Sequence, residues 1–281
     1  MSELVSTANL VSTKWLADHL NDVRVVDASW YMPDDKREPA REFEEAHIPG
    51  AVFFDIDGIA DHSTGLPHML PSPGEFSKAV GALGIGDGET VVVYDGAGLF
   101  SAPRAWWEFK AMGHKDVKVL DGGFPKWKRE GRPIESGRAQ PKAKFFTAIA
   151  EPEMVRGFDA VMDIVKDGTA QIVDARSASR FTAEEPEPRP GVRGGHMPGA
   201  INVHYRKLIA DDGTLKPPVA LQAAFSQVDL DKPVVTSCGS GLTAAILMMA
   251  LAEIGKNDVA LYDGSWTEWG GRPEAPVVRG P

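Results

Sequence analysis

Residues 234–249 read V-V-T-S-C-G-S-G-L-T-A-A-I-L-M-M and contain the only cysteine of the 281-residue chain, Cys238. The apolar run 234–237 predicts a buried strand, and the apolar run 244–251 predicts a buried helix that begins a few residues later. The turn between them contains two glycines, which allow several N–H groups to point inward around one atom. A strand followed at once by a helix is typical of a parallel α/β sheet, which binds ligands beyond the carboxyl ends of its strands.

Four short motifs occur twice in the chain, in the same order and about 147 residues apart at the first pair. The pairs are V-V-D-A (25–28) and I-V-D-A (172–175), A-H-I-P-G-A (46–51) and G-H-M-P-G-A (195–200), V-V-Y-D-G-A-G-L (92–99) and V-V-T-S-C-G-S-G-L (234–242), and L-D-G-G-F (120–124) with Trp127 and Y-D-G-S-W (262–266) with Trp269. Four matches in one order indicate a duplicated domain.

In each copy, short β-branched runs alternate with amphipathic segments. This pattern predicts an α/β protein made of tandem duplicated domains, each a parallel sheet flanked by helices. The segment around residues 131–145 is rich in Pro, Gly and Lys and lacks periodicity, which is typical of a linker. We therefore expect a first domain at 1–133, a linker at 134–150 and a second domain at 151–281.

The composition, 43% hydrophobic and 25% charged, is that of a globular protein. No stretch approaches the roughly 18 apolar residues of a membrane span, and the N-terminus lacks the features of a signal peptide, so we expect a cytoplasmic protein without membrane contact. The net charge of −10 and the lack of a Lys/Arg-rich run argue against nucleic-acid binding. A single cysteine fits a reducing compartment and excludes a thiolate-rich metal site; we expect no cofactor and no metal.

Two roles are open for Cys238. Free cysteines are commonly buried as small hydrophobic residues. However, the equivalent position in the first copy is Asp95, which would be a costly unpaired charge in a hydrophobic core, so we expect this position to be accessible in both copies. The loop amides and the positive end of the following helix would stabilise a nucleophilic thiolate. Asp95 is expected to be a vestigial nucleophile position or an acceptor that stabilises its loop, without a catalytic role.

The motif C-G-S-G-L-T at 238–243, with the flanking motifs G-H-M-P-G-A and Y-D-G-S-W-T-E-W-G, resembles the two-domain rhodanese-type sulfurtransferases, and among them those that use 3-mercaptopyruvate. The resemblance extends over nearly the whole chain, including D-H-S-T-G-L-P-H-M-L-P (61–71) and F-S-A-P-R-A-W-W-E-F (100–109). It implies tandem rhodanese domains of which only the second is catalytic. It also implies transfer of sulfur from 3-mercaptopyruvate to Cys238 as a persulfide, release of pyruvate, and delivery of the sulfur to a thiol or cyanide. Because the chain has no second cysteine, the acceptor must be external, either a small thiol or a protein such as thioredoxin.

The resemblance also implies which residues bind the donor. Relatives that use thiosulfate resemble C-R-K-G-V-T, with two cations where this chain has the neutral Gly239 and Ser240, so a monoanionic keto acid is favoured. Arg180 and Arg189 match the family's substrate-carboxylate arginines, whose planar guanidinium groups suit bidentate binding. From the residues alone, the more common role is to balance Glu184, Glu185 and Glu187 in a solvated loop. Further expectations are that Arg193 is solvated and that the substrate also contacts Gly239, Gly241, Leu242 and Thr243.

The family pattern pairs Ser240 with His68 and Asp57 of the first domain. Such a chain could carry a proton to the enolate of pyruvate as it leaves, and the site would then bridge the domains. The run Asp57, Asp61, His62 and His68 could also be interpreted as a metal site, but residues of one loop without fixed spacing are a weak signal.

Other recurring residues point to structure rather than chemistry. His47 and His196 occupy equivalent positions in both copies, which favours a structural role in a turn. The Trp106-Trp107 pair and the residues Trp266 and Trp269 are expected in core and interdomain packing.

Three other functions remain open on the sequence. A thiosulfate:cyanide sulfurtransferase is disfavoured by the missing loop cations. A cysteine phosphatase would resemble Cys-x5-Arg, whereas position 244 is Ala244. A sulfur-relay or binding module with slow turnover is disfavoured by the presence of Asp57, His68 and Ser240, because a passive carrier needs no proton relay.

Overall fold

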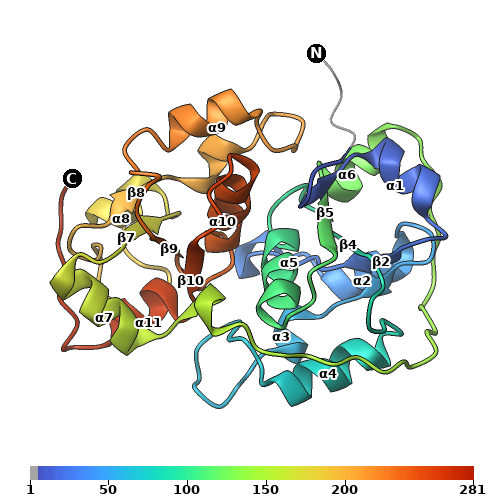
Figure 1. Cartoon of the computed structure of the whole chain (residues 1–281), viewed down its shortest axis with the longest axis horizontal. Coiled ribbons are helices and arrows are strands. Elements are labelled where there is room, and N and C mark those ends of the chain that lie inside the picture. The colour runs from blue at the N-terminus through green and yellow to red at the C-terminus, as the bar shows by residue number, and fades with distance from the viewer. Residues whose placement is uncertain (1–5) are drawn as a thin grey trace. The chain divides into compact units, whose positions relative to one another are not determined.

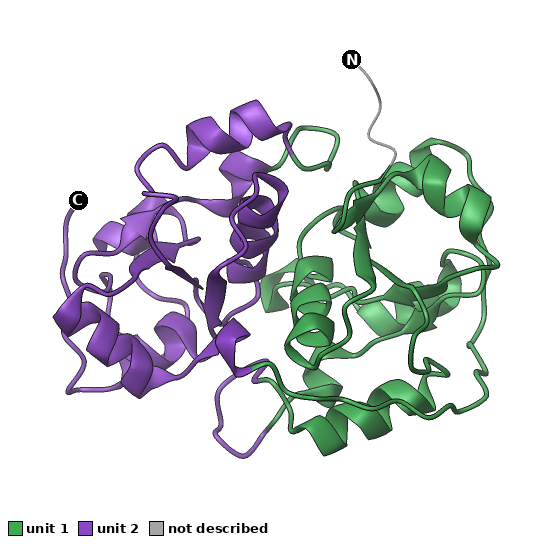
Figure 2. Cartoon of the chain, viewed as in Figure 1, with its two compact units in different colours: residues 1–61, 70–151, 209–215 green, residues 62–69, 152–208, 216–281 purple. Residues whose placement is uncertain are grey.

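Short apolar runs form the strands of two parallel sheets, one in each of two units of the chain (Figures 1 and 2). The computed structural model describes residues 6–281. Unit 1 contains the chain up to Asp61, Leu70–Glu151 and Ile209–Leu215, and unit 2 contains His62–Met69, Pro152–Leu208 and Lys216–Pro281. Each unit therefore includes one short segment from the other half of the sequence.

The sheet of unit 1 has the strand order β1-β5-β4-β2-β3, and every pairing is parallel. Its strands are β1 (Leu10–Val11), β2 (Arg24–Asp27), β3 (Val52–Phe53), β4 (Val91–Tyr94) and β5 (Val117–Leu120). All four residues of β4 are buried, as expected for a central strand covered on both faces. The register places Asp27 beside Tyr94 at the carboxyl ends of β2 and β4.

Helices cover both faces of this sheet. They are α1 (Thr13–His19), α2 (Pro39–Glu45), α3 (Ile56–Ile59), α4 (Pro73–Ala82), α5 (Ala102–Ala111) and α6 (Gly123–Arg129), with a 3-10 turn η1 (Pro33–Asp35). On one face, Leu16 of α1, Phe43 of α2 and Trp127 of α6 share a buried cluster with the sheet. On the other face, Phe76 of α4 and Phe109 of α5 pack edge to face with ring centroids 5.3 Å apart.

Unit 2 repeats this topology with the strand order β6-β10-β9-β7-β8. Its strands are β6 (Val155–Arg156), β7 (Gln171–Asp174), β8 (Ile201–Asn202), β9 (Val234–Ser237) and β10 (Val259–Tyr262). Its helices are α7 (Phe158–Asp167), α8 (Ala178–Thr182), α9 (Pro218–Ala224), α10 (Ala244–Glu253) and α11 (Ser265–Gly271), with 3-10 turns η2 (Pro152–Met154) and η3 (Tyr205–Leu208). The equal strand orders confirm the predicted tandem of duplicated α/β domains.

The four tryptophans singled out in the sequence are buried. Trp107, Trp266 and Trp269 have no exposed surface, and Trp106 is 2% exposed. Trp266 and Trp269 belong to the core cluster of unit 2 with Phe158 and Tyr262. The expected role of these rings in core packing is confirmed.

The segment 134–150, expected to be a linker, lies along unit 1. Its backbone donates hydrogen bonds from Glu135 to the carbonyl of His47 (2.9 Å), from Lys144 to Gly81 (2.9 Å) and from Ile149 to Met112 (2.9 Å). Gly81 is required by this contact, because a Cβ at this position would lie 2.6 Å from the carbonyl oxygen of Lys144. The segment is therefore bonded to unit 1 and is not a free tether.

Candidate active site

Cys238 lies directly after β9, the middle strand of the second sheet, at the carboxyl edge of that sheet. The turn 239–243 leads into α10. This helix is buried from Ala244 to Leu251, and its packing fixes the residue at which it begins. Gly241 has φ +81°, a left-handed conformation that favours glycine. The predicted strand, turn and helix are thus present, and Cys238, Gly239, Ser240, Gly241, Leu242 and Thr243 form one loop.

Cys238 and the equivalent residue of the first copy, Asp95, are both buried, contrary to the expectation that this position is accessible in both copies. Cys238 is 2% exposed and Asp95 is fully buried. The expectation was wrong because it assumed that a buried carboxylate at this position would be unpaired. In fact, the carboxylate of Asp95 accepts five backbone hydrogen bonds from its own loop, at 2.8–2.9 Å. Asp95 therefore acts as the acceptor that stabilises its loop, one of the two roles considered.

The backbone of the Cys238 loop is anchored from its carbonyl side by the beginning of α11. The carbonyl of Cys238 accepts from the N–H of Trp266 (3.0 Å), and the carbonyl of Gly239 accepts from the N–H (2.9 Å) and the hydroxyl (2.6 Å) of Thr267. In a trans peptide the C=O and the following N–H point in opposite directions. The N–H groups of Gly239 and Ser240 consequently face away from α11. Within residues 6–281, the amides of 239–244 donate to no protein acceptor.

Ser265 is a site residue that sequence reasoning missed. Its hydroxyl accepts from the N–H of Cys238 (3.2 Å) and donates to the carbonyl of Tyr262 (2.8 Å), and the residue is fully buried. It has φ +47°, which is rare for a residue with a Cβ, and the equivalent position in the first copy is Gly123 with φ +53°. A serine where the repeat has a glycine was the available signal in the sequence.

Arg180 of α8 lies against the cysteine loop. A Cβ built on Gly239 would be 3.2 Å from Nη2 and 3.9 Å from Nη1 of Arg180, so the guanidinium group rests on the glycine. Nη2 donates to Glu187 at 2.5 Å, and Nε is buried and has no hydrogen-bond partner among the described residues. Arg180 therefore keeps donor capacity next to the thiol. Its place at the loop fits the predicted role, whereas the neighbouring Glu184 and Glu185 are exposed.

A buried ion-pair network holds this arginine. Glu187, with a side chain 3% exposed, accepts from Arg180 through one oxygen and from Nη1 of Arg176 (2.7 Å) through the other. Arg176 also pairs with Asp174 at the end of β7 (2.7 Å), and its guanidinium lies 4.3 Å from the ring centroid of Trp266. Burial opposes the charge of Arg176, but Asp174 and Glu187 outweigh it and raise the pKa of the guanidinium. Arg176 was not predicted as a site residue, although it directly follows the repeated motif I-V-D-A at 172–175.

The predictions for Arg189 and Arg193 differ in how they compare with the structure. Arg189 is half-buried in the segment that follows Glu187, and its role in substrate binding stays a prediction. We expected Arg193 to be solvated, but its guanidinium group is bonded to the protein backbone. It donates to the carbonyls of Gly270 (3.0 Å), Arg272 (2.5 Å) and Ala275 (3.0 Å), because the C-terminal end of α11 leaves carbonyls that need donors. Arg193 is thus a structural clamp.

The predicted proton relay is distributed over both units. Asp57 lies in α3 of unit 1, where its Oδ2 accepts from the indole N–H of Trp30 at 2.7 Å. His68 and Ser240 belong to unit 2, and both are buried, at 3% and 9% exposed. His68 has φ +60°, an uncommon conformation for a residue with a Cβ that often marks functional segments. The relay itself stays a prediction.

The paired histidines make equivalent structural contacts in the two units. Nδ1 of His47 is bonded to the carbonyl of Phe43 (2.7 Å) and its ring stacks on Phe43 at 4.1 Å. Nδ1 of His196 is bonded to the carbonyl of Phe181 (2.9 Å) and its ring stacks on Phe181 at 3.8 Å. These repeated contacts are the structural role predicted for both residues. Among residues 6–281, no group of three or more His, Cys, Asp or Glu side chains is placed to hold a metal ion.

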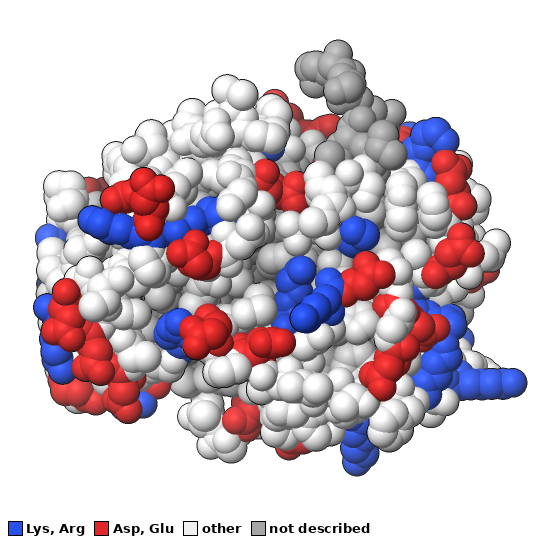
Figure 3. Space-filling model, in the orientation of Figure 1, with Lys and Arg blue, Asp and Glu red and all other residues white. Residues whose placement is uncertain are grey.

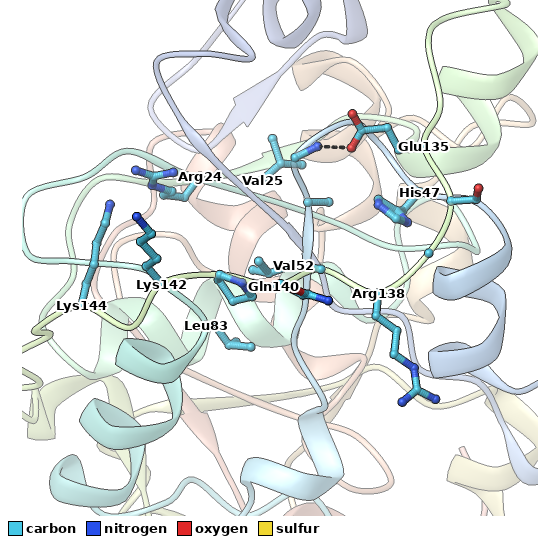
Figure 4. Close-up of a pocket in the computed structure, with 17 residues that line it drawn as sticks. Arg24, Val25, His47, Val52, Leu83, Glu135, Arg138, Gln140, Lys142 and Lys144 are labelled. Carbon is cyan, nitrogen blue, oxygen red and sulfur yellow. Dashed lines mark hydrogen bonds between the residues drawn. The ribbon is translucent and has the colours of Figure 1, made fainter.

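A cavity of about 490 Å³ in unit 1 contains none of the predicted site residues (Figure 4). Arg24, Arg138, Lys142 and Lys144 line it together with an apolar floor. Three of these cations are already paired: Arg24 and Lys144 share Glu89 (2.7 and 2.6 Å), and Arg138 pairs with Glu44 (2.7 Å). Burial would raise the pKa of Glu89, but hydrogen bonds from Lys144, Gly86 and Arg24 outweigh it and lower the pKa to about 2. The cavity therefore offers little unpaired positive charge.

The surface charge agrees with the acidic composition. On the face drawn in Figure 3, Lys and Arg side chains alternate with Asp and Glu and form no broad basic area among the described residues. In the described part of the chain, every helix is too short or too polar to cross a bilayer.

Two parallel five-stranded sheets of equal topology, with a cysteine in the loop that follows the middle strand of the second sheet, define a tandem rhodanese architecture. The rhodanese-like domain family matches residues 12–130 and 158–272, and the chain belongs to this family.

The chain is similar to curated sulfurtransferases over nearly its whole length. The chain is 44% identical to 3-mercaptopyruvate sulfurtransferase of Escherichia coli K12, over 97% of this chain and 99% of the relative. It is 45% identical to thiosulfate/3-mercaptopyruvate sulfurtransferase 1, mitochondrial, of Arabidopsis thaliana, over 97% of this chain and 79% of the relative. The crystal structure of SseA from Escherichia coli, described as a 3-mercaptopyruvate sulfotransferase with the rhodanese fold, superposes with a TM-score of 0.85 at 42% identity, over 92% and 99% of the two chains.

Proposed function

We propose that this chain is a 3-mercaptopyruvate sulfurtransferase with Cys238 as its nucleophile. The observation that carries the proposal is the position of Arg180, whose guanidinium rests on Gly239, the residue next to the thiol. A carboxylate bound by the free donors of Arg180 places the adjacent carbon atoms of a small keto acid beside Cys238. The ring of amides in the loop stabilises an anionic sulfur at the same place.

The reaction moves one sulfur atom and one proton. The thiolate of Cys238 attacks the sulfur of 3-mercaptopyruvate, and an S–S bond forms as the C–S bond breaks. The electron pair of that bond stays on the methylene carbon, giving the enolate of pyruvate. The proton of the substrate thiol is finally placed on this carbon, so the products are a Cys238 persulfide anion and pyruvate. In the second half-reaction an external thiolate or cyanide attacks the terminal sulfur and Cys238 leaves as a thiolate.

We assign the proton transfer to Ser240, His68 and Asp57. A histidine held by a carboxylate can accept and return a proton near neutral pH, and a serine hydroxyl can connect it to the substrate. Arg189 is proposed as a second ligand of the substrate carboxylate, and Gly241, Leu242 and Thr243 as backbone contacts of the reacting sulfur. This assignment rests on the family pattern and on the burial of His68 and Ser240.

The choice of donor is supported by the loop composition. Thiosulfate carries two negative charges, and the neutral Gly239 and Ser240 provide no cation beyond Arg180 and Arg189. A side chain at position 239 would also meet Arg180, since even a Cβ comes within 3.2 Å of Nη2. The relatives include an Arabidopsis enzyme whose name lists both donors, so thiosulfate:cyanide sulfurtransfer is the second candidate.

The acceptor is proposed to be a small thiol or a thioredoxin-like protein, and the location a reducing compartment such as the cytoplasm. The chain has one cysteine, so a loaded Cys238 has no internal thiol to discharge it. A reducing environment also keeps this thiol available between turnovers.

The test of the proposal is a single turnover with each donor. Incubation with 3-mercaptopyruvate should add the mass of one sulfur atom to Cys238 and release one equivalent of pyruvate, and Cys238→Ser should do neither. Equal or faster turnover with thiosulfate would reverse the donor assignment. Sulfur loading without repeated turnover in the presence of excess thiol would instead identify a sulfur-relay module.

The relay is tested separately by His68→Ala. Its loss should slow pyruvate release, measured by stopped-flow, more than it weakens binding of the substrate carboxylate. Asp61→Ala, in the same run of sequence, is the control. An unchanged rate of pyruvate release in His68→Ala would exclude the relay and leave the sulfur transfer intact.

A further inference from the structure

Unit 1 holds a buried anion in a loop equivalent to the catalytic one. Oδ1 of Asp95 accepts from the amides of Ala97 (2.9 Å) and Gly98 (2.8 Å). Oδ2 accepts from three further amides, those of Phe100 (2.8 Å), Ser101 (2.9 Å) and Ala102 (2.8 Å). Asp95 has no exposed surface, so these bonds replace water completely. We call this set of five amides the unit 1 cradle.

The cradle is the counterpart of the catalytic loop. Residues 95–102 correspond to residues 238–245 through the repeated G-x-G-L motif. The amides of Ser240, Gly241, Thr243 and Ala244, which correspond to four of the five donors, bond to no acceptor within residues 6–281. The fifth, Ala245, bonds to the carbonyl of Leu242 (3.3 Å) because α10 begins one residue earlier than α5.

Bond counting gives the relation between the two anions. A carboxylate oxygen of aspartate stands three bonds from Cα. The terminal sulfur of a cysteine persulfide also stands three bonds from Cα, whereas the sulfur of a cysteine thiolate stands only two. Asp95 therefore presents its charge at the same number of bonds from the backbone as a sulfur-loaded cysteine would.

We propose that the unit 1 cradle is a site for a small carboxylate that the chain fills with its own side chain, and that Asp95 is a permanent counterpart of the loaded Cys238. The comparison with the persulfide rests on the proposed function, but the anion site itself does not. Buried amide donors without an acceptor are costly, so the carboxylate of Asp95 stabilises the folded state of unit 1. Removal of the carboxylate creates a site that free formate can occupy.

The test compares three substitutions in the full-length chain, all made on Cys238→Ser so that no turnover or persulfide contributes. Asp95→Gly removes the carboxylate and leaves space. Asp95→Asn keeps the shape but sets an amide group, which has donors of its own, against the N–H groups. Asp87→Gly is the matched control, because Asp87 is an exposed residue of unit 1 whose carboxylate accepts from the N–H and the hydroxyl of Thr147.

Thermal unfolding is measured in sodium formate and in sodium chloride at equal ionic strength. Asp95→Gly should unfold more than about 5 °C below the parent, and formate should restore part of this loss in proportion to the logarithm of its concentration. Propionate, which is too large for the cradle, should restore nothing. Asp95→Asn should be destabilised without recovery in formate, and Asp87→Gly should respond to formate and chloride alike.

The proposal is overturned if Asp95→Gly responds equally to formate and chloride, or if Asp95→Asn is as stable as the parent. If Asp95→Gly does not fold without added anion, the yield of refolding with formate against chloride gives the same comparison. None of these measurements uses sulfur transfer, so a failure here leaves the proposed function standing. A negative result in the donor assay would likewise not contradict the anion site proposed for the unit 1 cradle.

Discussion

Nη2 of Arg180 lies 2.5 Å from Oε2 of Glu187, and the other oxygen of this carboxylate is bonded to Arg176. Glu187 is almost fully buried, whereas Arg180 remains one-fifth exposed. The carboxylate is therefore the fixed partner, and it holds the guanidinium against Gly239. The acidic residues around Arg180 do not simply neutralise it in solvent, because one of them orients it toward the thiol.

Glu187→Gln should weaken the binding of the keto acid more than it slows sulfur transfer. The neutral amide cannot hold two guanidinium groups, so Arg180 loses its orientation while keeping its charge. The loss of about 1–2 kcal/mol corresponds to a rise of roughly 5- to 30-fold in KM for 3-mercaptopyruvate, with a smaller change in kcat. Steady-state kinetics on the purified variant measure both constants.

The matched control for this variant is Glu185→Gln, an exposed acidic residue of the same segment that is bonded to Ser179. It should leave both constants near those of the parent. Equal effects of the two substitutions would mean that the charge of the segment matters and the position of Arg180 does not.

Gly239→Ala should also act through Arg180. The new Cβ would lie 3.2 Å from Nη2, so the guanidinium must shift by a few tenths of an ångström. Because the backbone of Gly239 is not left-handed, alanine adds crowding without backbone strain. We expect KM for 3-mercaptopyruvate to rise about 2- to 10-fold, in line with a loss of 0.5–1.5 kcal/mol for one displaced contact, with the thermal midpoint unchanged.

Gly271→Ala provides the comparison for crowding, because a Cβ at the end of α11 meets no atom within 4 Å. Normal kinetics in Gly271→Ala with a raised KM in Gly239→Ala is the expected pair of results. A normal KM in both variants would show that Arg180 does not bind the substrate from its present position.

Thr267→Val should loosen the cysteine loop without unfolding unit 2. Valine has nearly the shape of threonine and keeps the backbone bond to Gly239, but it lacks the hydroxyl that donates to the same carbonyl at 2.6 Å. The loss of one hydrogen bond of about 0.5–1.5 kcal/mol should lower kcat/KM about 2- to 10-fold. Thr147→Val, which removes a hydroxyl bonded to Asp87 in unit 1, should leave kcat/KM unchanged. If both variants behave like the parent, the anchor from α11 does not set the loop geometry.

The strand, turn and helix around Cys238 and the duplication were predictable because they depend on local apolar runs and on motifs that repeat along the chain. The burial of Asp95 was not predictable from residue types, since the groups that satisfy it are backbone amides. The same holds for Arg193, whose partners are carbonyls at a helix end. Arg176 precedes α8 in the sequence and Glu187 follows it. No periodic pattern of residues therefore indicates that their side chains are paired. Ser265 was visible only as a departure from the glycine of the first copy.

One more difference between the copies has a consequence for stability. Asp27 and Asp174 occupy equivalent buried positions at the ends of β2 and β7. Asp174 is paired with Arg176, but the residue at the position of Arg176 in the first copy is Ser29, which offers only its amide and hydroxyl to Asp27. Burial without a cation raises the pKa of Asp27 to about 6.

The free energy of unfolding of the parent should fall as the pH rises from about 4 to about 6. In Asp27→Asn this fall should be absent. In this range the unfolded chain has already released the proton of Asp27, whereas the folded chain still holds it, so folding becomes less favourable with rising pH and the loss is complete above the folded pKa. Two pKa units correspond to about 3 kcal/mol, an upper value for this single group. Urea unfolding of both proteins at intervals between pH 4 and pH 7 measures the difference in free energy of unfolding, with the exposed Asp22→Asn as the control for net charge. A difference between Asp27→Asn and the parent that stays constant across this range would show that Asp27 is already ionised at pH 4 in the folded protein.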